Sequence, residues 1–556
     1  MPRLLLSVFG LLFLSLISAS EDDTVVVTNS GSIQGKRILA GPGSVTAYLG
    51  IPYAKPPLGK LRFQKPLPHP PWTHVLETTR FGNSCPQANA SGLFDIDIWV
   101  ANTPLSEDCL FLNIWVPHPK PSTPAPILVW IQGMGYVTGT ASLEIYNGAT
   151  LAATENVIVA SMNYRLGALG FLYMPPHAPG NVGLWDQHLA LKWLKENAAV
   201  FGGNPAQLTL VGHGAGAAMV GFHLLSPVSQ PLFSHAVLQG GVPNAIWPWK
   251  DTQKAKLDAE MVSQEVGCPL DADTVSCLQR IEIGDKKFSQ LTAINSLTVD
   301  GEFLTDEPRK LLKDANFQGK SIITGILADE GSTFVLYMYP NTKSNGGIVT
   351  WEQLYQGVMG TMANGTNEAV AQAVARKFSE NYHGPEQYRL AFAQYFRDYF
   401  FVCSLDEFAA KIREAGRPVY VYSFDHRSSG STWPEWVKTP YGSEVPYLFG
   451  SFKAALPTSQ PVAEAEKALS RRVMRYWAEF ARSGNPTGSK PSVVQWPLYN
   501  ATEQNVFHID IEAPRTMPIA PVQCNFPATH QSYAKQLKGH CISSDHEKDI
   551  ANGASA

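Results

Sequence analysis

The sequence has no block of five or six basic residues, and its 43 Lys and Arg against 47 Asp and Glu give a formal charge of −4. Binding to nucleic acid through counterion release is therefore not expected. It also has no internal repeat, no low-complexity tract and no clear linker between domains. Since 44% of its 556 residues are hydrophobic, the composition indicates a large globular chain with a substantial core.

Only the N-terminus carries a long apolar run. Residues 4–17 are largely apolar, follow Arg3 and are succeeded by three small residues at 18–20. This pattern predicts a secretory signal peptide over residues 1–20. A membrane anchor is the alternative, but it needs about 20 apolar residues, and this run is shorter and leads into acidic residues at 21–23. We therefore expect a mature protein that is extracellular and does not span a membrane.

Seven cysteines in an oxidising compartment favour disulfides over metal or thiolate chemistry, and we predict neither a metal nor a cofactor. Spacing suggests a short loop closed by Cys268 and Cys277 and a longer one closed by Cys85 and Cys109. Because seven is odd, one thiol must be unpaired or intermolecular. Spacing alone leaves the partners of the three remaining cysteines open: Cys403, Cys524 and Cys541.

Three Asn-X-Ser/Thr sequences are candidate glycosylation sites and fit a secreted protein. Their acceptor residues are Asn89, Asn364 and Asn500.

Short apolar runs alternate with helical patterns along most of the chain. The runs lie at 127–131, 157–160, 208–211, 235–238, 322–326 and 419–422. Unbroken runs of this length are typical of strands buried on both faces. Residues 186–201 form the clearest helical pattern, which ends at Gly202 and Gly203. The alternation predicts an α/β fold with a doubly wound, mostly parallel sheet and helices on both faces.

Residues 208–216 (LTLVGHGAG) have the pattern of a strand, a sharp turn with small flanking residues, and the start of a helix. This is the geometry of a nucleophile elbow, GxSxG, with Gly214 at the position of the nucleophile. Further motifs are SEDCLFLN at 106–113, NYRLGALGF at 163–171, FGGNP at 201–205 and DEG at 329–331. On these motifs the sequence resembles the cholinesterase and type-B carboxylesterase family of α/β-hydrolases over residues 25–527. The resemblance implies one α/β-hydrolase domain over residues 21–527, followed by a polar tail at 528–556.

The resemblance also places each part of the family's catalytic site. The acid of the triad matches Glu330, the histidine position holds Tyr441, and the serine position holds Gly214. In the family that this sequence resembles, the oxyanion loop usually carries three consecutive glycines. The matching positions here hold Gly133, Met134 and Gly135. A glycine cannot attack a carbonyl and a neutral tyrosine is a poor base, so we expect a pseudoenzyme without serine-esterase activity.

Two polar residues near this site each have two readings. By resemblance to the cholinesterases, the position of His213 usually holds an acidic residue. In one reading, His213 acts as nucleophile or base in a rewired esterase. In the other, it only packs at the elbow. Glu330 either keeps an active role or only accepts hydrogen bonds from turn amides. For both residues, the sequence favours the structural reading.

In enzymes of the cholinesterase branch, an aromatic gorge holds quaternary ammonium ions, and the matching positions here remain aromatic. Cation–π attraction to such rings contributes about 0.5 to 2 kcal/mol each. Replacing an acid by His213 should instead favour a neutral or anionic ligand, whereas Asp95 and Asp97, close before Trp99, would add negative potential in the opposite direction. The alternative is that the rings fill the gorge as core. The candidate ligand-binding residues are Trp99, His213, Trp247, Phe334, Tyr337 and Trp433.

The resemblance implies three disulfides, Cys85–Cys109, Cys268–Cys277 and Cys403–Cys524. Cys541 is then left in the tail, either capped or linking two copies, so we expect a monomer or a Cys541-linked dimer. The leading functional prediction is a secreted, non-catalytic, cholinesterase-like glycoprotein that binds a small ligand or an extracellular protein. The alternative is a residual or rewired esterase that uses His213.

Overall fold

An eleven-stranded sheet forms the centre of this computed structural model, which describes residues 23–87, 97–282, 294, 296–314, 317, 319–362, 368–455, 461–488, 494–518 and 524. The strand order is β18-β17-β16-β15-β12-β11-β7-β8-β6-β4-β3. In this order, the strands from β17 to β8 all pair in parallel. The pairs at the two ends are antiparallel: β18 with β17 at one end, and β8 with β6, β6 with β4 and β4 with β3 at the other. The predicted mostly parallel α/β architecture is therefore confirmed.

The strands of this sheet have the following bounds: β3 Lys36–Ala40, β4 Gly43–Pro52, β6 Phe111–His118, β7 Ala125–Ile131, β8 Ile158–Met162, β11 Gly203–His213, β12 His235–Gln239, β15 Ser321–Leu327, β16 Val419–Phe424, β17 Asn505–Ile509 and β18 Arg515–Pro518. All six predicted runs lie within or overlap strands of the sheet. Strands β7, β8, β12, β15 and β16 are buried almost throughout, since helices cover both faces. Three small sheets lie outside the central sheet. The first contains β1 Val25–Thr28, β2 Gly31–Gln34 and β5 Leu76–Glu77. The second pairs β9 Tyr173–Met174 with β10 Ala178–Pro179, and the third pairs β13 Trp249–Lys250 with β14 Leu297–Thr298.

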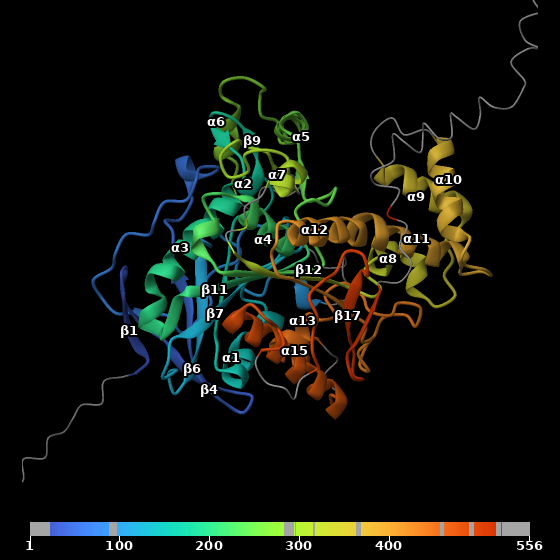
Figure 1. The fold of residues 1–556 in the computed structure, drawn as a ribbon. Helices are drawn as coiled ribbons and strands as arrows, with labels where there is room; N and C mark the ends of the chain where they lie inside the picture. The colour runs from blue at the N-terminus through green and yellow to red at the C-terminus, as the bar shows by residue number, and fades with distance from the viewer. Residues whose placement is uncertain are drawn as a thin grey trace, which may run out of the picture.

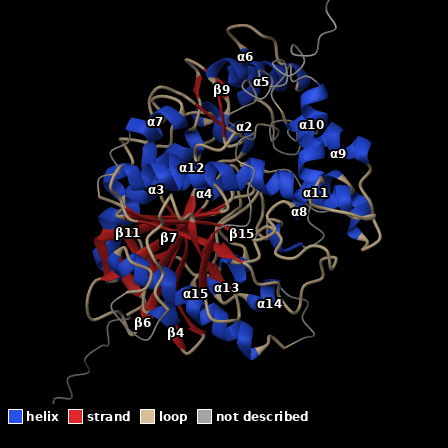
Figure 2. Ribbon diagram, turned by 45° about the vertical axis from the view of Figure 1, so that its right-hand side comes forward, coloured by secondary structure: helices blue, strands red, loops and turns tan. Residues whose placement is uncertain are grey.

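Helices lie on both faces of the sheet, with α3, α4 and α12 on one side and α1, α13 and α15 on the other (Figures 1 and 2). A group formed by α8 to α11 lies at one end, beyond the sheet. The α-helices are α1 Ala149–Glu155, α2 Gly167–Phe171, α3 Val182–Asn197, α4 Ala215–Leu225, α5 Thr252–Glu265, α6 Thr274–Gln279, α7 Pro308–Asp314, α8 Ser332–Met338, α9 Trp351–Thr361, α10 Glu368–Ser379, α11 Gln387–Arg397, α12 Cys403–Glu414, α13 Val445–Phe449, α14 Phe452–Ala455 and α15 Glu464–Ser483.

Alternate residues along a strand pack into different apolar clusters. On β7, for example, Val129 belongs to the cluster that contains α3 and α4, whereas Trp130 belongs to the cluster that contains α15. This period of two follows from the pleat of a strand. A third cluster holds α8 to α11 together.

The predicted helix at 186–201 begins earlier, at Val182, and its last four residues form a separate 3₁₀ turn before Gly202. Asp186 does not begin the helix because its carboxylate is buried and binds Arg165, with Nε–Oδ2 at 2.8 Å and Nη2–Oδ1 at 2.7 Å. The start of the helix was therefore predicted four residues too late.

All three disulfides implied by the resemblance are present: Cys85–Cys109, Cys268–Cys277 and Cys403–Cys524. Cys541, the N-terminal segment at 1–20 and the tail at 528–556 lie outside the described residues, as do Asn89 and Asn364. Asn500 is exposed, as glycosylation requires. Within the described residues, no helix is both long and apolar enough to cross a bilayer.

Candidate functional site

The turn at Gly214 has the strained geometry that the sequence predicted. It connects β11 to α4 with φ 56° and ψ −118°, a conformation that glycine adopts far more readily than other residues. The Gly214 amide donates to the Gln239 carbonyl at 2.7 Å, and the Gly214 carbonyl accepts from the Ala218 amide at 3.0 Å. Strand, turn and helix are therefore all in place without a nucleophile.

The side chain of Tyr441 occupies the space that a residue other than glycine at position 214 would need. A Cβ atom built on Gly214 would overlap the Tyr441 hydroxyl. That hydroxyl donates to the Gly133 carbonyl at 3.3 Å. Burial, followed by the nearby Glu330 charge, raises the pKa of Tyr441 well above its ordinary value. The phenol is therefore a neutral hydrogen-bond donor that fills the elbow.

Two buried carboxyl groups lie close to this tyrosine. Glu330 Oε2 accepts from the Leu327 amide at 2.7 Å, which is the turn-amide contact that the sequence analysis expected, and Oε1 has no partner within the described residues. Burial, followed by the charge of Glu444, raises the pKa of Glu330 to about 8. Glu330 is therefore mostly protonated at neutral pH. Glu444 Oε1 accepts from Gln239 Nε2 at 3.1 Å.

His213 is fully buried at the end of β11. Its ring centroid lies 4.3 Å from that of Tyr441, and its Nε2 lies 3.8 Å from Glu444 Oε1. Neither ring nitrogen forms a hydrogen bond to any residue that the structure describes. Burial lowers the pKa of His213, although the Glu444 carboxylate acts in the opposite direction. The ring therefore packs at the elbow as a neutral group.

The raised pKa of Glu330 predicts a pH-dependent stability. The unfolded chain releases this proton near pH 4.5 and the folded chain near pH 8, so the wild-type free energy of unfolding should fall as pH rises between these values. The slope from one such proton is about 1.4 kcal/mol per pH unit. Urea unfolding at several pH values should show that Glu330→Gln makes the free energy of unfolding less dependent on pH, by up to about 1.4 kcal/mol per pH unit.

The matched control is the exposed Glu435→Gln, which should keep the wild-type slope. Equal slopes for wild type and Glu330→Gln would show that Glu330 is ionised in the folded state.

The loop at 132–136 follows β7 and lies directly against the elbow. A Cβ atom at Gly133 would overlap the His213 carbonyl, so only glycine fits there. Met134 is 4% exposed and packs in the apolar cluster that includes Trp99 and Tyr146, and Gly135 has φ 66°. The Gly133 carbonyl is already bonded to the Tyr441 hydroxyl. Loop and elbow thus form one packed unit.

A cavity beside the elbow has a volume of about 80 Å³. Trp99, Trp433 and Tyr441 line it, together with Tyr447 and Phe452. Small-molecule sites usually have volumes of about 300 to 1,000 Å³, so this cavity is several times smaller than a usual ligand site. The structure therefore brings Trp99 and Trp433 together around a small space, with Tyr441 as part of its wall.

The other aromatic candidates pack elsewhere. Phe334 stacks on Phe396 with centroids 5.5 Å apart and meets the Tyr441 ring edge-on at 6.4 Å. Trp247 donates from Nε1 to the Phe400 carbonyl at 3.0 Å. Tyr337 is half-buried on α8, close to Phe334. None of these residues lines the cavity of Trp99 and Trp433.

Of the two acids proposed to restore negative potential, Asp95 and the side chain of Asp97 lie outside the described structure. Glu444, which the sequence analysis did not single out, is the acid that faces His213. Its place three residues after Tyr441 was the available signal.

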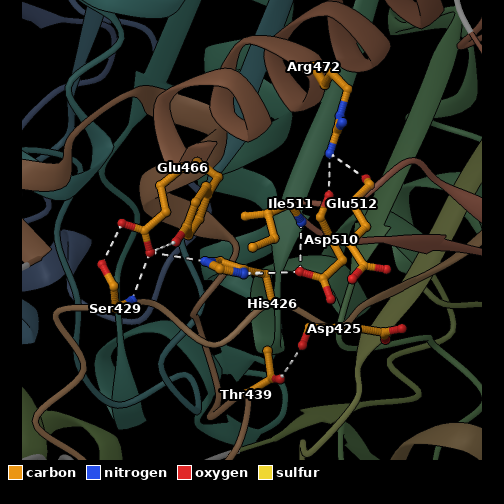
Figure 3. A network of polar contacts seen from close by, with 10 residues as sticks. Asp425, His426, Ser429, Thr439, Glu466, Arg472, Asp510, Ile511 and Glu512 are labelled. Carbon is orange, nitrogen blue, oxygen red and sulfur yellow. Dashed lines mark hydrogen bonds and ion pairs between the residues drawn. The ribbon is translucent and has the colours of Figure 1, made fainter. Parts of the chain in front are cut away.

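A polar network fixes the loop that carries Trp433 and Tyr441 (Figure 3). The His426 ring lies between two carboxylates, with Nε2 3.0 Å from Glu466 Oε1 and Nδ1 3.0 Å from Asp510 Oδ1. Ser429 donates to Glu466 from both its amide and its hydroxyl, each at 2.8 Å. Thr439 Oγ1 donates to the Asp425 carbonyl at 3.2 Å. The position of Tyr441 is therefore set by the loop as a whole.

Comparison with known sequences places this geometry among esterase relatives. A sequence model described as the carboxylesterase family matches residues 22–526. An acetylcholinesterase from Bungarus fasciatus is 39% identical over 521 residues, which cover 90% of this chain and 85% of that protein. A cholinesterase from Mus musculus is 39% identical over 531 residues, which cover 92% of this chain and 87% of that protein.

Proposed function

The chain belongs to the carboxylesterase family and has the α/β-hydrolase fold, and we propose that it is a secreted member that binds a ligand or partner without hydrolysing esters. One observation carries this proposal. The Tyr441 hydroxyl lies in the space that a nucleophile at position 214 would occupy. The elbow is therefore filled as well as lacking its serine.

The expected loss of catalysis is large. Removing nucleophile and base from a serine hydrolase lowers turnover by roughly 10⁶ and leaves about 10³ over water. Each hydrogen-bond donor of an oxyanion hole raises turnover by ~10² to 10³. Here the predicted oxyanion loop contains the buried Met134, and its Gly133 carbonyl accepts from the Tyr441 hydroxyl, so we expect this contribution to be lost as well. We expect no measurable turnover above the uncatalysed rate.

The direct test is incubation of the pure, full-length protein with activated acyl esters and choline esters, followed by treatment with a serine-directed organophosphorus probe. Neither turnover nor stable labelling is expected. Saturable hydrolysis that is lost on His213→Ala would instead establish the rewired esterase. The burial of His213 argues against that alternative, because an imidazole without access to an ester cannot attack it.

The small cavity bears on what is bound. Its 80 Å³ favours contact with the rim, by an extracellular protein or by a ligand that remains outside, over capture of a cation beside Trp99. Tetramethylammonium provides the test. A working cation site would raise the unfolding free energy by about 2.7 kcal/mol at 100 times its Kd, whereas we expect no shift in Tm at millimolar concentration.

Secretion and assembly give a further prediction. The three disulfides and the exposed acceptor Asn500 support an oxidising, extracellular compartment for the proposed glycoprotein. If Cys541 links two copies, non-reducing electrophoresis of the secreted protein should show a dimer that Cys541→Ser abolishes. A monomer band for both proteins would contradict the link.

A further inference from the structure

A second, much larger cleft lies between α11 and the edge strands of the sheet. Its volume is about 870 Å³, within the range of about 300 to 1,000 Å³ usual for small-molecule sites. Residues of α11, β16, β17 and β18 line it, together with the loops at 328–329 and 436–438. The cleft therefore has the size that the cavity beside Gly214 lacks.

A histidine and an aspartate form a partly exposed pair in the wall of this cleft. His508 Nδ1 lies 2.6 Å from Asp425 Oδ2, and Ser423 Oγ donates to Asp425 Oδ1 at 2.6 Å. Both oxygens of this carboxylate are therefore already bonded. Because Nδ1 faces the aspartate, Nε2 is the ring nitrogen left for another group.

The other two acids of the cleft are also bonded. Asp329 Oδ2 accepts from the Lys438 amide at 2.8 Å, and burial raises the pKa of Asp329 to about 6. Glu386 pairs with Arg389. The lining acids thus leave little unpaired negative charge for a bound cation.

The unsatisfied groups of the lining are nitrogens. His508 Nε2 and Arg397 Nε are both buried and have no hydrogen-bond partner within the described residues. Arg397 Nη1 already donates to Asp398 at 2.7 Å, which fixes its guanidinium. Lys438 and Arg515 add two exposed cationic residues to the lining. A ligand that supplies acceptor oxygens would satisfy Arg397 Nε, and its negative charge would pair with Lys438 and Arg515.

Apolar groups complete the cleft. Leu390 and Met517 lie among its lining residues, as do the rings of Tyr382 and Trp436. An apolar wall next to a few convergent polar groups is the usual composition of a small-molecule site.

We propose that this cleft binds a small aromatic carboxylate. The carboxylate pairs with the exposed side chains of Lys438 and Arg515 and accepts from Arg397 Nε, while the ring lies against the apolar wall. Such charge-assisted hydrogen bonds are stronger than neutral ones. The proposal does not depend on whether the chain hydrolyses esters, since the cleft and the elbow are lined by different residues.

Isothermal titration of the full-length protein with 2-naphthoate tests the proposal. We expect one site with a Kd below about 1 mM. The neutral isostere 2-naphthamide should bind at least about tenfold more weakly, because it lacks the charge that these nitrogens recognise. Absence of saturable naphthoate binding, or equal affinity for acid and amide, overturns the proposal.

Variants locate the site. Lys438→Ala and Arg515→Ala should each weaken naphthoate binding by threefold or more, whereas Arg471→Ala, an exposed arginine on α15 outside the cleft, should not. Both lining residues are exposed, so each variant should fold. Unchanged affinity in both variants would place the ligand elsewhere and overturn the proposal.

Discussion

A serine introduced at Gly214 alone is expected to destabilise the protein and to leave it inactive. Its Cβ would overlap the Tyr441 hydroxyl, and its backbone would have to keep a φ of 56°. Overpacking usually costs about 1 to 3 kcal/mol, and a strained backbone a similar amount, so the unfolding free energy should fall by about 2 to 5 kcal/mol. Urea unfolding followed by tryptophan fluorescence, which does not depend on activity, measures this change in the free energy of unfolding.

The overlap can be separated from the backbone strain by a double-mutant cycle. Tyr441→Ala removes the obstructing ring, so Gly214→Ser should cost less in that background, with a coupling of about 0.5 to 3 kcal/mol. Gly346→Ser is the matched control, since a Cβ there meets nothing within 4 Å, and it should change stability by less than about 0.5 kcal/mol. Additive effects of the two changes would show that Tyr441 does not fill the elbow.

The largest gain is expected from Gly214→Ser combined with Tyr441→His. The histidine would clear the space at position 214 and place a base close to Glu330, which stands at the position predicted for the triad acid and has one oxygen without a hydrogen-bond partner among the described residues. A complete triad contributes about 10⁶ to turnover, so even an imperfect one should raise hydrolysis of an activated acyl ester at least about 10²-fold over wild type. Stopped-flow release of the leaving group, with labelling of Ser at 214 by an organophosphorus probe, measures the gain.

Adding Met134→Gly should increase the rate further, by up to ~10², if the thioether is what restricts the oxyanion loop. Glu330→Gln in the double variant is the internal control and should remove most of the gained activity, because the new histidine would lose its orienting acid. A double variant that folds, is accessible to the probe and yet shows no turnover would mean that elements beyond these positions have also been lost.

Much of this architecture could be predicted because it rests on local patterns. Apolar runs of four or five residues located the parallel strands, since a strand covered on both faces can contain little else. The glycines at 212, 214 and 216 identified the elbow for a similar reason, because the close approach of strand and helix leaves no room for larger side chains. The three disulfides followed from resemblance, whereas spacing alone left Cys403 and Cys524 unpaired.

What the sequence did not reveal depends on contacts between distant segments. Tyr441 was predicted to stand in place of the family's histidine, but only the structure shows that this side chain lies in the space that a side chain at position 214 would need. The aromatic residues of the gorge could be listed, but not the volume between them. The buried Asp186 likewise looked like a helix start because its partner, Arg165, lies outside the helix.

The bond between Cys403 and Cys524 fixes the point from which the C-terminal tail departs, next to α12. From there to Cys541 are seventeen residues, which reach at most about 60 Å when fully extended. Given this reach, two copies joined through Cys541 would not need a shared packed interface. Against a partner that displays the same epitope twice, such a pair would gain avidity through effective concentration, with no improvement in either single contact.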